Sequence, residues 1–345
     1  MDFKIGKIYF GRKEPPVIIG EIGINHGGSI KIAKEMVKSA SKTGLKIIKH
    51  QTHIIEDEMI PSAKKTIPGN SSKSIYEIMS ECALNEDEEF ELFEYTKSLG
   101  LEFISTPFSR AAVERLEKFG VNGYKIGSGE CNNLPLIDHI VNKGKPIILS
   151  TGMNDLLSVK STVDFIDNRV PIALLHTTNL YPTPPHLVRL GAMKDLANEF
   201  KGIPFGLSDH TTNNLSSIGA IAMGATIIER HYTDKKSRKG PDIICSMDEK
   251  ETSDLIRDSI ELFSMLGGKK KAVLEEQVTI NFAFSSVVTI KAIKKGDIFS
   301  RENIWVKRPG NGEIPASDFD KIIGQIAKNN IPKDVQLKQN DFLIK

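Results

Sequence analysis

The sequence predicts a (β/α)₈ barrel, the TIM-barrel class of α/β fold, followed by a small β-rich domain. Three observations support this prediction. A short apolar run followed by a segment with helical spacing recurs eight times. The runs are continuous rather than alternating, which indicates strands buried on both faces. Eight such units favour a closed barrel over an open sheet, and 345 residues accommodate a barrel of about 250 residues plus an appendage.

The expected strands are the apolar runs 17–19, 46–48, 102–104, 123–126, 146–149, 172–175, 204–207 and 226–228. Between them, apolar residues recur at three- and four-residue spacing, which predicts helices. Ile32, Met36, Val37 and Ala40 are one such set. Phe90, Phe93, Tyr95 and Leu99 roughly form another. Glycines where a helix would end precede several strands: Gly44, Gly100, Gly120, Gly144, Gly202 and Gly224.

The chain divides into residues 1–267 for the barrel, 268–282 for a linker and 283–345 for the β-rich domain. Gly267 and Gly268, followed by three lysines, end the last helical segment. Beyond them, β-like pieces at 286–290 and 303–306 are separated by turn signals. Residues 52–86 are too long for one βα loop, so we expect them to cover the active site.

Composition excludes several classes of function. The 46 basic and 44 acidic residues leave a net charge of +2, which argues against nucleic-acid binding and against an anionic membrane partner. No apolar stretch resembles a signal peptide or a membrane span. The three cysteines, Cys82, Cys131 and Cys245, are widely spaced, which suggests a reducing compartment. We therefore expect a cytoplasmic enzyme.

Polar residues end every expected strand, where barrel enzymes carry their chemistry. One group can bind phosphate, because it combines two ammonium groups with several neutral donors. A serine at a strand end often serves only local hydrogen bonding, but buried unpaired lysines are rare there. The proposed phosphate residues are Lys49, Lys125, Ser128, Ser150, Asn179 and Ser208.

A second group can bind a metal. His210 and His231 follow neighbouring strands, the seventh and eighth, so they are expected to be adjacent. Glu21 or Asp242 could add a carboxylate. Imidazole with carboxylate or water suits Mn²⁺, Fe²⁺, Co²⁺ or Zn²⁺. A lone buried histidine is more often a packing residue, but a pair from adjacent strands favours the metal site.

Longer motifs carry a resemblance to a known family. They occur in order along nearly the whole chain: EIGINH (21–26), KHQTH (49–53), IPGN (67–70), STPFS (105–109), KIGSGECNN (125–133), STGM (150–153), TNLYPTP (178–184), GLSDHT (206–211), ERHYTD (229–234) and GPDIICSMD (240–248). With these motifs the chain resembles the sialic acid synthase family, the phosphoenolpyruvate-dependent synthases of N-acetylneuraminate and related nonulosonates. Residues 296–312 are similar to the antifreeze-like SAF domain of those enzymes.

The resemblance implies a role for each matching residue. Thr106 joins the six phosphate residues in binding phosphoenolpyruvate. His210 and His231 hold the metal, expected to be Mn²⁺, with Mg²⁺ or Co²⁺ as alternatives. A domain-swapped homodimer is implied, in which Arg308 serves the partner's barrel. The residues implied to contact the acylated mannosamine are Glu21, Gln51, Asn70, Glu130, Tyr181, Asp242, Phe282 and Arg308.

The implied reaction joins phosphoenolpyruvate to the open-chain aldehyde of N-acetylmannosamine, with water, to give N-acetylneuraminate and phosphate by C–O cleavage. Glu21 and Glu130 are the candidate acid and base, and His210 and His231 complete the catalytic set. A diacetamido trideoxy sugar leading to legionaminate, or the pseudaminate precursor, is the alternative substrate. Two other classes are weaker: a metal-dependent aldolase or epimerase leaves the lysines unexplained, and a carbohydrate- or ice-binding protein leaves the whole polar set unexplained.

Overall fold

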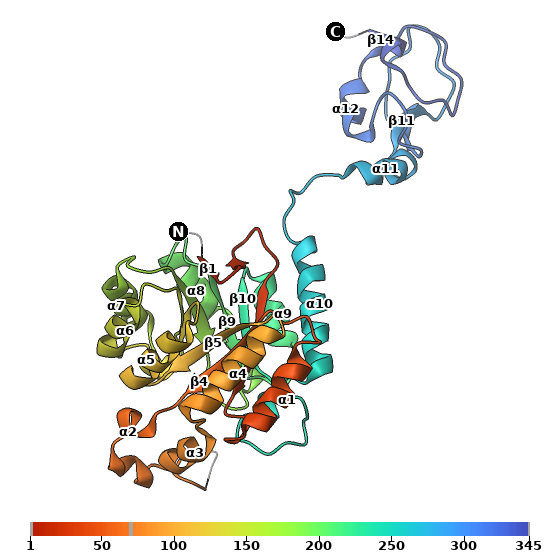
Figure 1. Cartoon of the computed structure of the whole chain (residues 1–345). Helices are drawn as coiled ribbons and strands as arrows, with labels where there is room; N and C mark the ends of the chain where they lie inside the picture. Colours follow the sequence, from red (N-terminus) through yellow and green to blue (C-terminus); the bar gives the residue numbers. More distant parts are fainter. Residues whose placement is uncertain (1–2, 69–71, 344–345) are drawn as a thin grey trace. The chain divides into compact units, whose positions relative to one another are not determined.

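The structure, a computed structural model, describes residues 3–68 and 72–343. The chain falls into two compact units, Met1–Leu266 and Gly267–Lys345 (Figure 1). The segment expected to be a linker belongs to the second unit. It contains a 3₁₀ turn, η5 (Leu274–Glu276), and most of a short helix, α11 (Gln277–Ala283).

The first unit is a closed barrel of eight parallel strands, in the order β10-β3-β4-β5-β6-β7-β8-β9. This confirms the predicted fold class. Each expected run coincides with one strand, although five runs begin one residue before it, and several strands continue into the polar residues that follow. The strands are β3 (Val17–Gly23), β4 (Ile47–Thr52), β5 (Glu102–Pro107), β6 (Tyr124–Ile126), β7 (Ile147–Ser150), β8 (Ile172–Thr177), β9 (Phe205–Asp209) and β10 (Ile227–His231).

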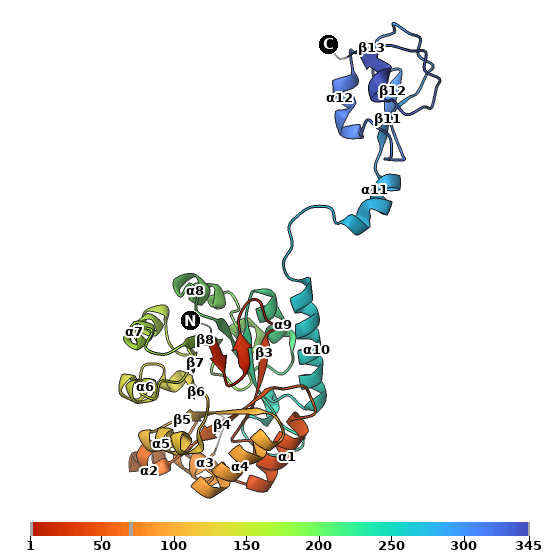
Figure 2. The ribbon, with the colours of Figure 1, turned by 45° about the horizontal axis from the view of Figure 1, so that its top comes forward.

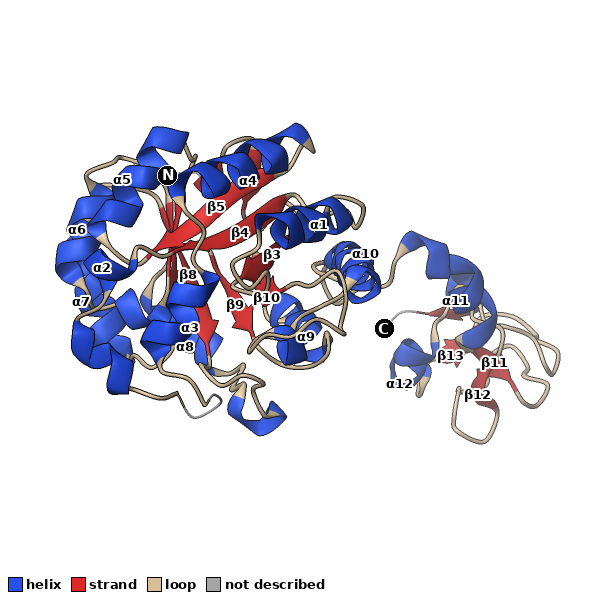
Figure 3. Cartoon of the chain, turned by 60° about the horizontal axis from the view of Figure 1, so that its bottom comes forward, coloured by secondary structure: helices blue, strands red, loops and turns tan. Residues whose placement is uncertain are grey.

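Helices surround the strands (Figure 3). Their buried residues pack against the outer face of the barrel in one large apolar cluster. In α1, Met36, Val37 and Ala40 are buried as the spacing predicts, whereas Phe90 of α4 is 45% exposed. The six glycines predicted at helix ends all have positive φ. The helices are α1 (Ile30–Ala40), α4 (Glu86–Ser98), α5 (Arg110–Phe119), α6 (Leu134–Val141), α7 (Leu156–Ile166), α8 (Ala192–Glu199), α9 (Leu215–Ala222) and α10 (Glu249–Met265).

A hairpin that the sequence analysis did not predict closes the end of the barrel at which the strands begin (Figure 2). Its strands are β1 (Phe3–Ile5) and β2 (Ile8–Phe10), paired antiparallel. Their apolar side chains join the inward-facing residues of the barrel in a second cluster: Val17, Ile19, Ile47, Ile104, Ile148, Ala173, Leu175 and Ile227. The half of the barrel interior nearest the start of the strands is therefore filled by apolar side chains.

The long segment between β4 and α4 is more ordered than a loop. It holds α2 (Ile55–Glu58), the 3₁₀ helix η1 (Pro61–Lys65) and α3 (Ile75–Cys82). A capping box begins α3, in which Ser74 and Glu77 each bond the other's backbone N–H. The far end of α3 packs against the β3–α1 loop. A Cβ at Gly28, whose φ is +75°, would lie 2.2 Å from the carbonyl oxygen of Glu81.

The second unit has its own apolar core, which includes Val287, Phe299 and Leu337. Strand β11 (Ser286–Thr289) pairs antiparallel with β12 (Ile304–Lys307), and β13 (Ile326–Ala327) with β14 (Phe342–Leu343). Short helical pieces are η6 (Ala316–Asp318), α12 (Phe319–Ile322) and η7 (Gln339–Asp341). In neither unit is a described helix long and apolar enough to cross a membrane.

Candidate active site

A cavity of about 320 Å³ opens at the carboxyl ends of the barrel strands. Most residues predicted from the sequence line it: Glu21, Lys49, Gln51, Thr106, Lys125, Ser128, Ser150, Asn179, Tyr181, Ser208, His210, His231 and Asp242. They come from all eight strands or from the loops that follow them. The structure thus brings together the phosphate and metal groups that the sequence suggested separately.

The period-2 alternation of a β-strand explains this convergence. Successive side chains point to opposite faces, so a polar residue two positions after a core residue enters the cavity. Glu21 follows Ile19 in this way, and Lys49 follows Ile47. The intervening residues face the helices. The inward-facing residues are therefore apolar near the start of each strand and polar near its carboxyl end.

Four buried charged groups lie at the floor of the cavity. The Nζ of Lys49 lies 2.8 Å from Glu21 Oε2 and 3.6 Å from Glu229 Oε1. The Nζ of Lys125 lies 3.7 Å from Glu229 Oε1 and donates to Ser150 Oγ at 2.7 Å. Two cations thus face two carboxylates, which makes their burial tolerable.

Glu229 is one of the polar residues expected at the strand ends, but the sequence assigned it no specific role. It is buried, lines the cavity, and its Oε2 has no hydrogen-bond partner among the described residues. The signal was present in the sequence, because Glu229 stands two positions after the core residue Ile227 and two before His231. That alternation directs both polar side chains inward.

The two lysines differ in their affinity for protons. Burial acts to lower the pKa of Lys49, but the carboxylates of Glu21 and Glu229 outweigh it and raise that pKa. Burial lowers the pKa of Lys125 to about 8, because its pairing with Glu229 compensates only in part. The same lysines hold the pKa of Glu229 below its usual value despite its burial. Lys49 is therefore a permanent cation, whereas Lys125 can titrate near neutral pH.

Neutral donors lie beside these charges. Ser128, in the 3₁₀ turn η2 (Ser128–Glu130), accepts a bond from the backbone N–H of Gly152 at 3.0 Å. A Cβ at Gly152 would lie 1.9 Å from Asn179 Oδ1, so only glycine allows this approach. Among the described residues, Asn179 Oδ1 has no hydrogen-bond partner. The Oγ of Ser208 lies 3.3 Å from Glu229 Oε1.

The two histidines are neighbours, as predicted, with ring centroids 5.5 Å apart. The Nδ1 of His210 bonds the carbonyl of Thr178 at 3.0 Å, which leaves Nε2 available. The Nδ1 of His231 is buried and has no hydrogen-bond partner in the described chain. Burial lowers the pKa of both to about 4, so both are neutral near pH 7.

These features fit a divalent metal, because neutral imidazole nitrogens are the ligand form. Asp242 lies beside the pair, with its Oδ2 3.8 Å from His231 Nδ1. Within the described residues, no group of three or more His, Cys, Asp or Glu side chains is placed to hold a metal. The protein thus offers two imidazoles, and the remaining ligands would be water or substrate.

The other side of the cavity suits a sugar. Gln51 Nε2 donates to Glu21 Oε1 at 2.7 Å, and the Tyr181 ring lies 4.1 Å from that of His210. Burial raises the pKa of Asp242 to about 6. Facing these polar groups, three residues of α3 form an apolar wall, so part of the segment 52–86 lines the cavity as expected: Ile75, Ile78 and Met79.

Four predicted residues are not brought into this cavity. Glu130 is half-buried but does not line it, and its Oε2 accepts a bond from Asn133 Nδ2 at 2.5 Å. Asn70 lies outside the described residues. Phe282 and Arg308 belong to the second unit, where both are exposed. Their proposed contacts with substrate stay predictions.

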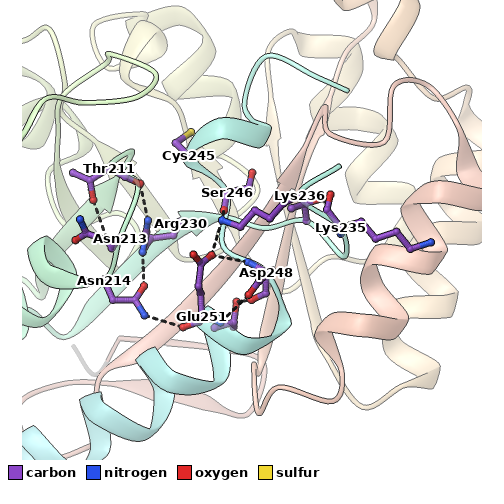
Figure 4. Close-up of polar contacts among 12 residues, drawn as sticks. Thr211, Asn213, Asn214, Arg230, Lys235, Lys236, Cys245, Ser246, Asp248 and Glu251 are labelled. Carbon is purple, nitrogen blue, oxygen red and sulfur yellow. Dashed lines mark hydrogen bonds and ion pairs between the residues drawn. The ribbon is translucent and has the colours of Figure 1, made fainter. Parts of the chain in front are cut away.

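A polar network lies behind the histidines, on the outer face of β9 and β10. Arg230, which precedes His231, donates to the carbonyl of Thr211 at 2.7 Å and to Asn214 (Figure 4). Its Nε lies 3.6 Å from Oδ2 of Asp209, which precedes His210. Each histidine therefore directly follows a buried residue of this network. The network holds the ends of both strands, and with them the two histidines, in place.

The chain has clear similarity to known proteins. Residues 36–271 match the NeuB family, and residues 284–343 match the SAF domain. An uncharacterized protein of Methanocaldococcus jannaschii is 38% identical, over 99% of this chain and 98% of that protein. The N,N'-diacetyllegionaminic acid synthase of Campylobacter jejuni is 35% identical, over 94% of this chain and 99% of that enzyme. The crystal structure of N-acetylneuraminic acid synthetase from Leptospira borgpetersenii superposes with a TM-score of 0.74 at 27% identity, covering 81% of this chain and 95% of that one.

Proposed function

Because the chain belongs to the NeuB family, we propose that it condenses phosphoenolpyruvate with the open-chain aldehyde of an acylated amino sugar, releasing phosphate and a nonulosonate. The observation that carries the proposal is the pair of buried lysines, Lys49 and Lys125, in one cavity with two neutral histidines. A phosphorylated substrate needs the lysines. An aldehyde that must be activated needs the histidines.

Phosphoenolpyruvate would occupy the floor of the cavity. The ammonium groups of Lys49 and Lys125 can pair with its phosphate and carboxylate, and the hydroxyls of Ser128 and Ser150 can donate to the same oxygens. Lys125 already contacts Ser150, so the donors converge before substrate arrives. Such preorganised donors stabilise charge that develops as phosphate leaves.

The aldehyde would lie above this floor, next to the histidines. His210 and His231 would hold a divalent metal, with Mn²⁺ expected and Mg²⁺ or Co²⁺ as alternatives. When bound, it would polarise the aldehyde oxygen as a Lewis acid. Tyr181, packed against His210, restricts where the sugar can lie.

Carbon 3 of phosphoenolpyruvate attacks the aldehyde carbon, forming the new C–C bond, and the aldehyde oxygen becomes a hydroxyl on taking up a proton. Water adds at carbon 2, and the bond from carbon 2 to the bridging oxygen breaks. The products are the 2-keto acid and inorganic phosphate. Glu21, held by Lys49 and Gln51, is the candidate that accepts the proton of the water. The sequence suggested Glu130 as the second catalytic carboxylate. We assign that role to Glu229 instead, because it is the second carboxylate buried in the cavity.

The sugar is N-acetylmannosamine in the first form of the proposal, giving N-acetylneuraminate. One observation favours the alternative, a diacetamido trideoxy sugar leading to legionaminate. The wall of Ile75, Ile78 and Met79 would meet a methyl group more favourably than a hydroxymethyl group. The 35% identity to the Campylobacter enzyme points to the same alternative.

A substrate panel tests both levels of the proposal. The purified protein with Mn²⁺ is given phosphoenolpyruvate and, in turn, N-acetylmannosamine, the diacetamido trideoxy sugar and the pseudaminate precursor, and both phosphate and 2-keto acid are measured. We expect stoichiometric formation of both products with one of these sugars. Turnover with pyruvate in place of phosphoenolpyruvate would instead indicate an aldolase.

A further inference from the structure

The loop that carries Asp242 is long and has little regular structure. It runs from the end of β10 at His231 to the start of α10 at Glu249, and contains only the 3₁₀ turn η4 (Ile243–Cys245). Its base is fixed, because the backbone of Met247 exchanges hydrogen bonds with His231 and Thr233. Asp242 precedes this base in the returning part of the loop and lies in the cavity beside His231.

Ser246 connects Asp242 to the barrel. Its hydroxyl donates to the carbonyl of Asp242 at 2.7 Å and accepts from Asn25 Nδ2 at 2.8 Å. The same Asn25 amide donates to the carbonyl of Tyr232 at 2.9 Å. Among the described residues, the Asp242 side chain itself has only the 3.8 Å contact with His231. The position of Asp242 therefore depends on its backbone, whose carbonyl accepts from Ser246 and, at 3.2 Å, from the backbone N–H of Cys245.

Lys236 holds Ser246 from the opposite side. Its ammonium donates to the carbonyl of Ser246 and pairs with Glu251 Oε2 at 2.6 Å (Figure 4). Glu251 lies in the first turn of α10 and is itself fixed by a capping box with Asp248. Lys236 thus connects the part of the loop that follows β10 to the part that precedes α10 and to the first turn of α10.

We propose that Lys236 is a positioning residue of the active site, which closes the loop between residues 236 and 246 and so holds Asp242 at the sugar side of the cavity. Without this contact, the segment would gain backbone freedom that binding of the sugar would have to restrict again. The phosphate side should be unaffected, because its lysines and serines come from β4, β6, η2, β7 and β9 and not from this loop. The proposal about Asp242 as a sugar contact rests on the proposed function.

Lys235 provides a matched control. It is the adjacent residue, it is exposed like Lys236, and it carries the same charge. In Figure 4 its side chain points away from the cluster, and within the described chain its ammonium has no ion-pair partner. Lys235→Ala therefore removes the same charge without breaking the contact with Ser246.

The test compares Lys236→Ala, Lys236→Arg and Lys235→Ala in the full chain. Hydrogen exchange without substrate reports the loop directly. We expect faster exchange in the segment 237–246 of Lys236→Ala only, with Lys236→Arg restoring protection. Unchanged exchange in Lys236→Ala would overturn the proposal whatever reaction the enzyme catalyses.

Steady-state kinetics then tests the functional part. Lys236→Ala should raise the KM for the sugar about 3- to 5-fold, the size expected from loss of an exposed ion pair, and leave the KM for phosphoenolpyruvate unchanged. Lys236→Arg and Lys235→Ala should match the wild type. Equal rises in both KM values, or no rise, would overturn the positioning role. A wild-type protein inactive on every sugar would instead refute the proposed function and leave the exchange result standing.

Discussion

Lys49 and Glu21 form a buried ion pair, with Nζ 2.8 Å from Oε2, across the register of two adjacent strands. Glu21 of β3 and Lys49 of β4 are direct partners in that register, so the pair follows from strand alignment alone. His231 of β10 is the partner of Glu21 on the other side. One row of the barrel thus brings a cation, a carboxylate and a candidate metal ligand together.

Lys125→Met should abolish catalysis by removing a cation from the phosphate side of the cavity. We expect kcat/KM for phosphoenolpyruvate to fall at least about 10³-fold, because a charge-assisted contact strengthened in the transition state is lost. Lys145→Met is the control, since Lys145 pairs with Glu117 outside the cavity. Comparable losses in the two variants would contradict the role of Lys125.

Activity should decline as the pH rises through about 8. Burial lowers the pKa of Lys125 to about 8, so its cation is lost above that pH and phosphoenolpyruvate should bind less well. Stability should change in the opposite sense. Between about pH 8 and the usual lysine pKa, Lys125 is protonated in the unfolded chain but neutral in the folded protein. Its contribution to the free energy of unfolding therefore increases with pH over this range.

The measurement is kcat/KM for phosphoenolpyruvate from pH 6 to pH 10, alongside denaturant unfolding. In Lys125→Arg, whose guanidinium stays charged, the decline near pH 8 should disappear. If the Lys125→Arg variant is active and its kcat/KM still declines near pH 8, the decline must come from the titration of another group.

Chelation should abolish activity, and Mn²⁺ should restore it. Because burial lowers the pKa of His210 and His231 to about 4, protons should not compete with the metal until the pH falls well below 6. Electron paramagnetic resonance titration with Mn²⁺ measures this affinity without turnover. His210→Ala should lose Mn²⁺ binding and keep its fold, and full activity in EDTA would contradict the assignment.

Glu89→Ala should destabilise the barrel without changing either KM. The Glu89 carboxylate is buried on the outer side of β4, where it contacts His50, Thr52 and Arg115. Its removal leaves buried partners unpaired, which costs about 3 kcal/mol of unfolding free energy. Glu91→Ala, on the exposed face of the same helix, should change stability by less than about 0.5 kcal/mol. Equal effects on denaturant midpoints would contradict this.

Most of the barrel could be predicted because strands buried on both faces have a distinctive sequence. Each continuous apolar run predicts a strand. The polar residues at the carboxyl end of that run are the ones expected to line the cavity. The β1–β2 hairpin was missed because three-residue strands carry almost no periodicity. Residues 52–86 were expected to cover the site, and α3 does line the cavity through Ile75, Ile78 and Met79, but its helical form was not predicted.

The site was predictable where alternation and motif agree, as at Glu21, Lys49 and His231. Glu229 was expected only as a polar residue at a strand end, without a specific role, and its pairing with Lys49 and Lys125 makes its burial stable. Glu130 follows β6 in the sequence, but the turn η2 directs it to Asn133 instead of the cavity. Contacts within an irregular loop, such as the one between Lys236 and Ser246, leave no trace in the sequence pattern.

The fate of the bridging oxygen tests the central claim most directly. The enzyme is given phosphoenolpyruvate labelled with ¹⁸O at the oxygen between carbon 2 and phosphorus, together with the accepted sugar, and both products are analysed by mass spectrometry. If water adds at carbon 2 and the C–O bond breaks, as proposed, the label appears in inorganic phosphate. Label retained in the sugar acid would show cleavage of the P–O bond and contradict the mechanism.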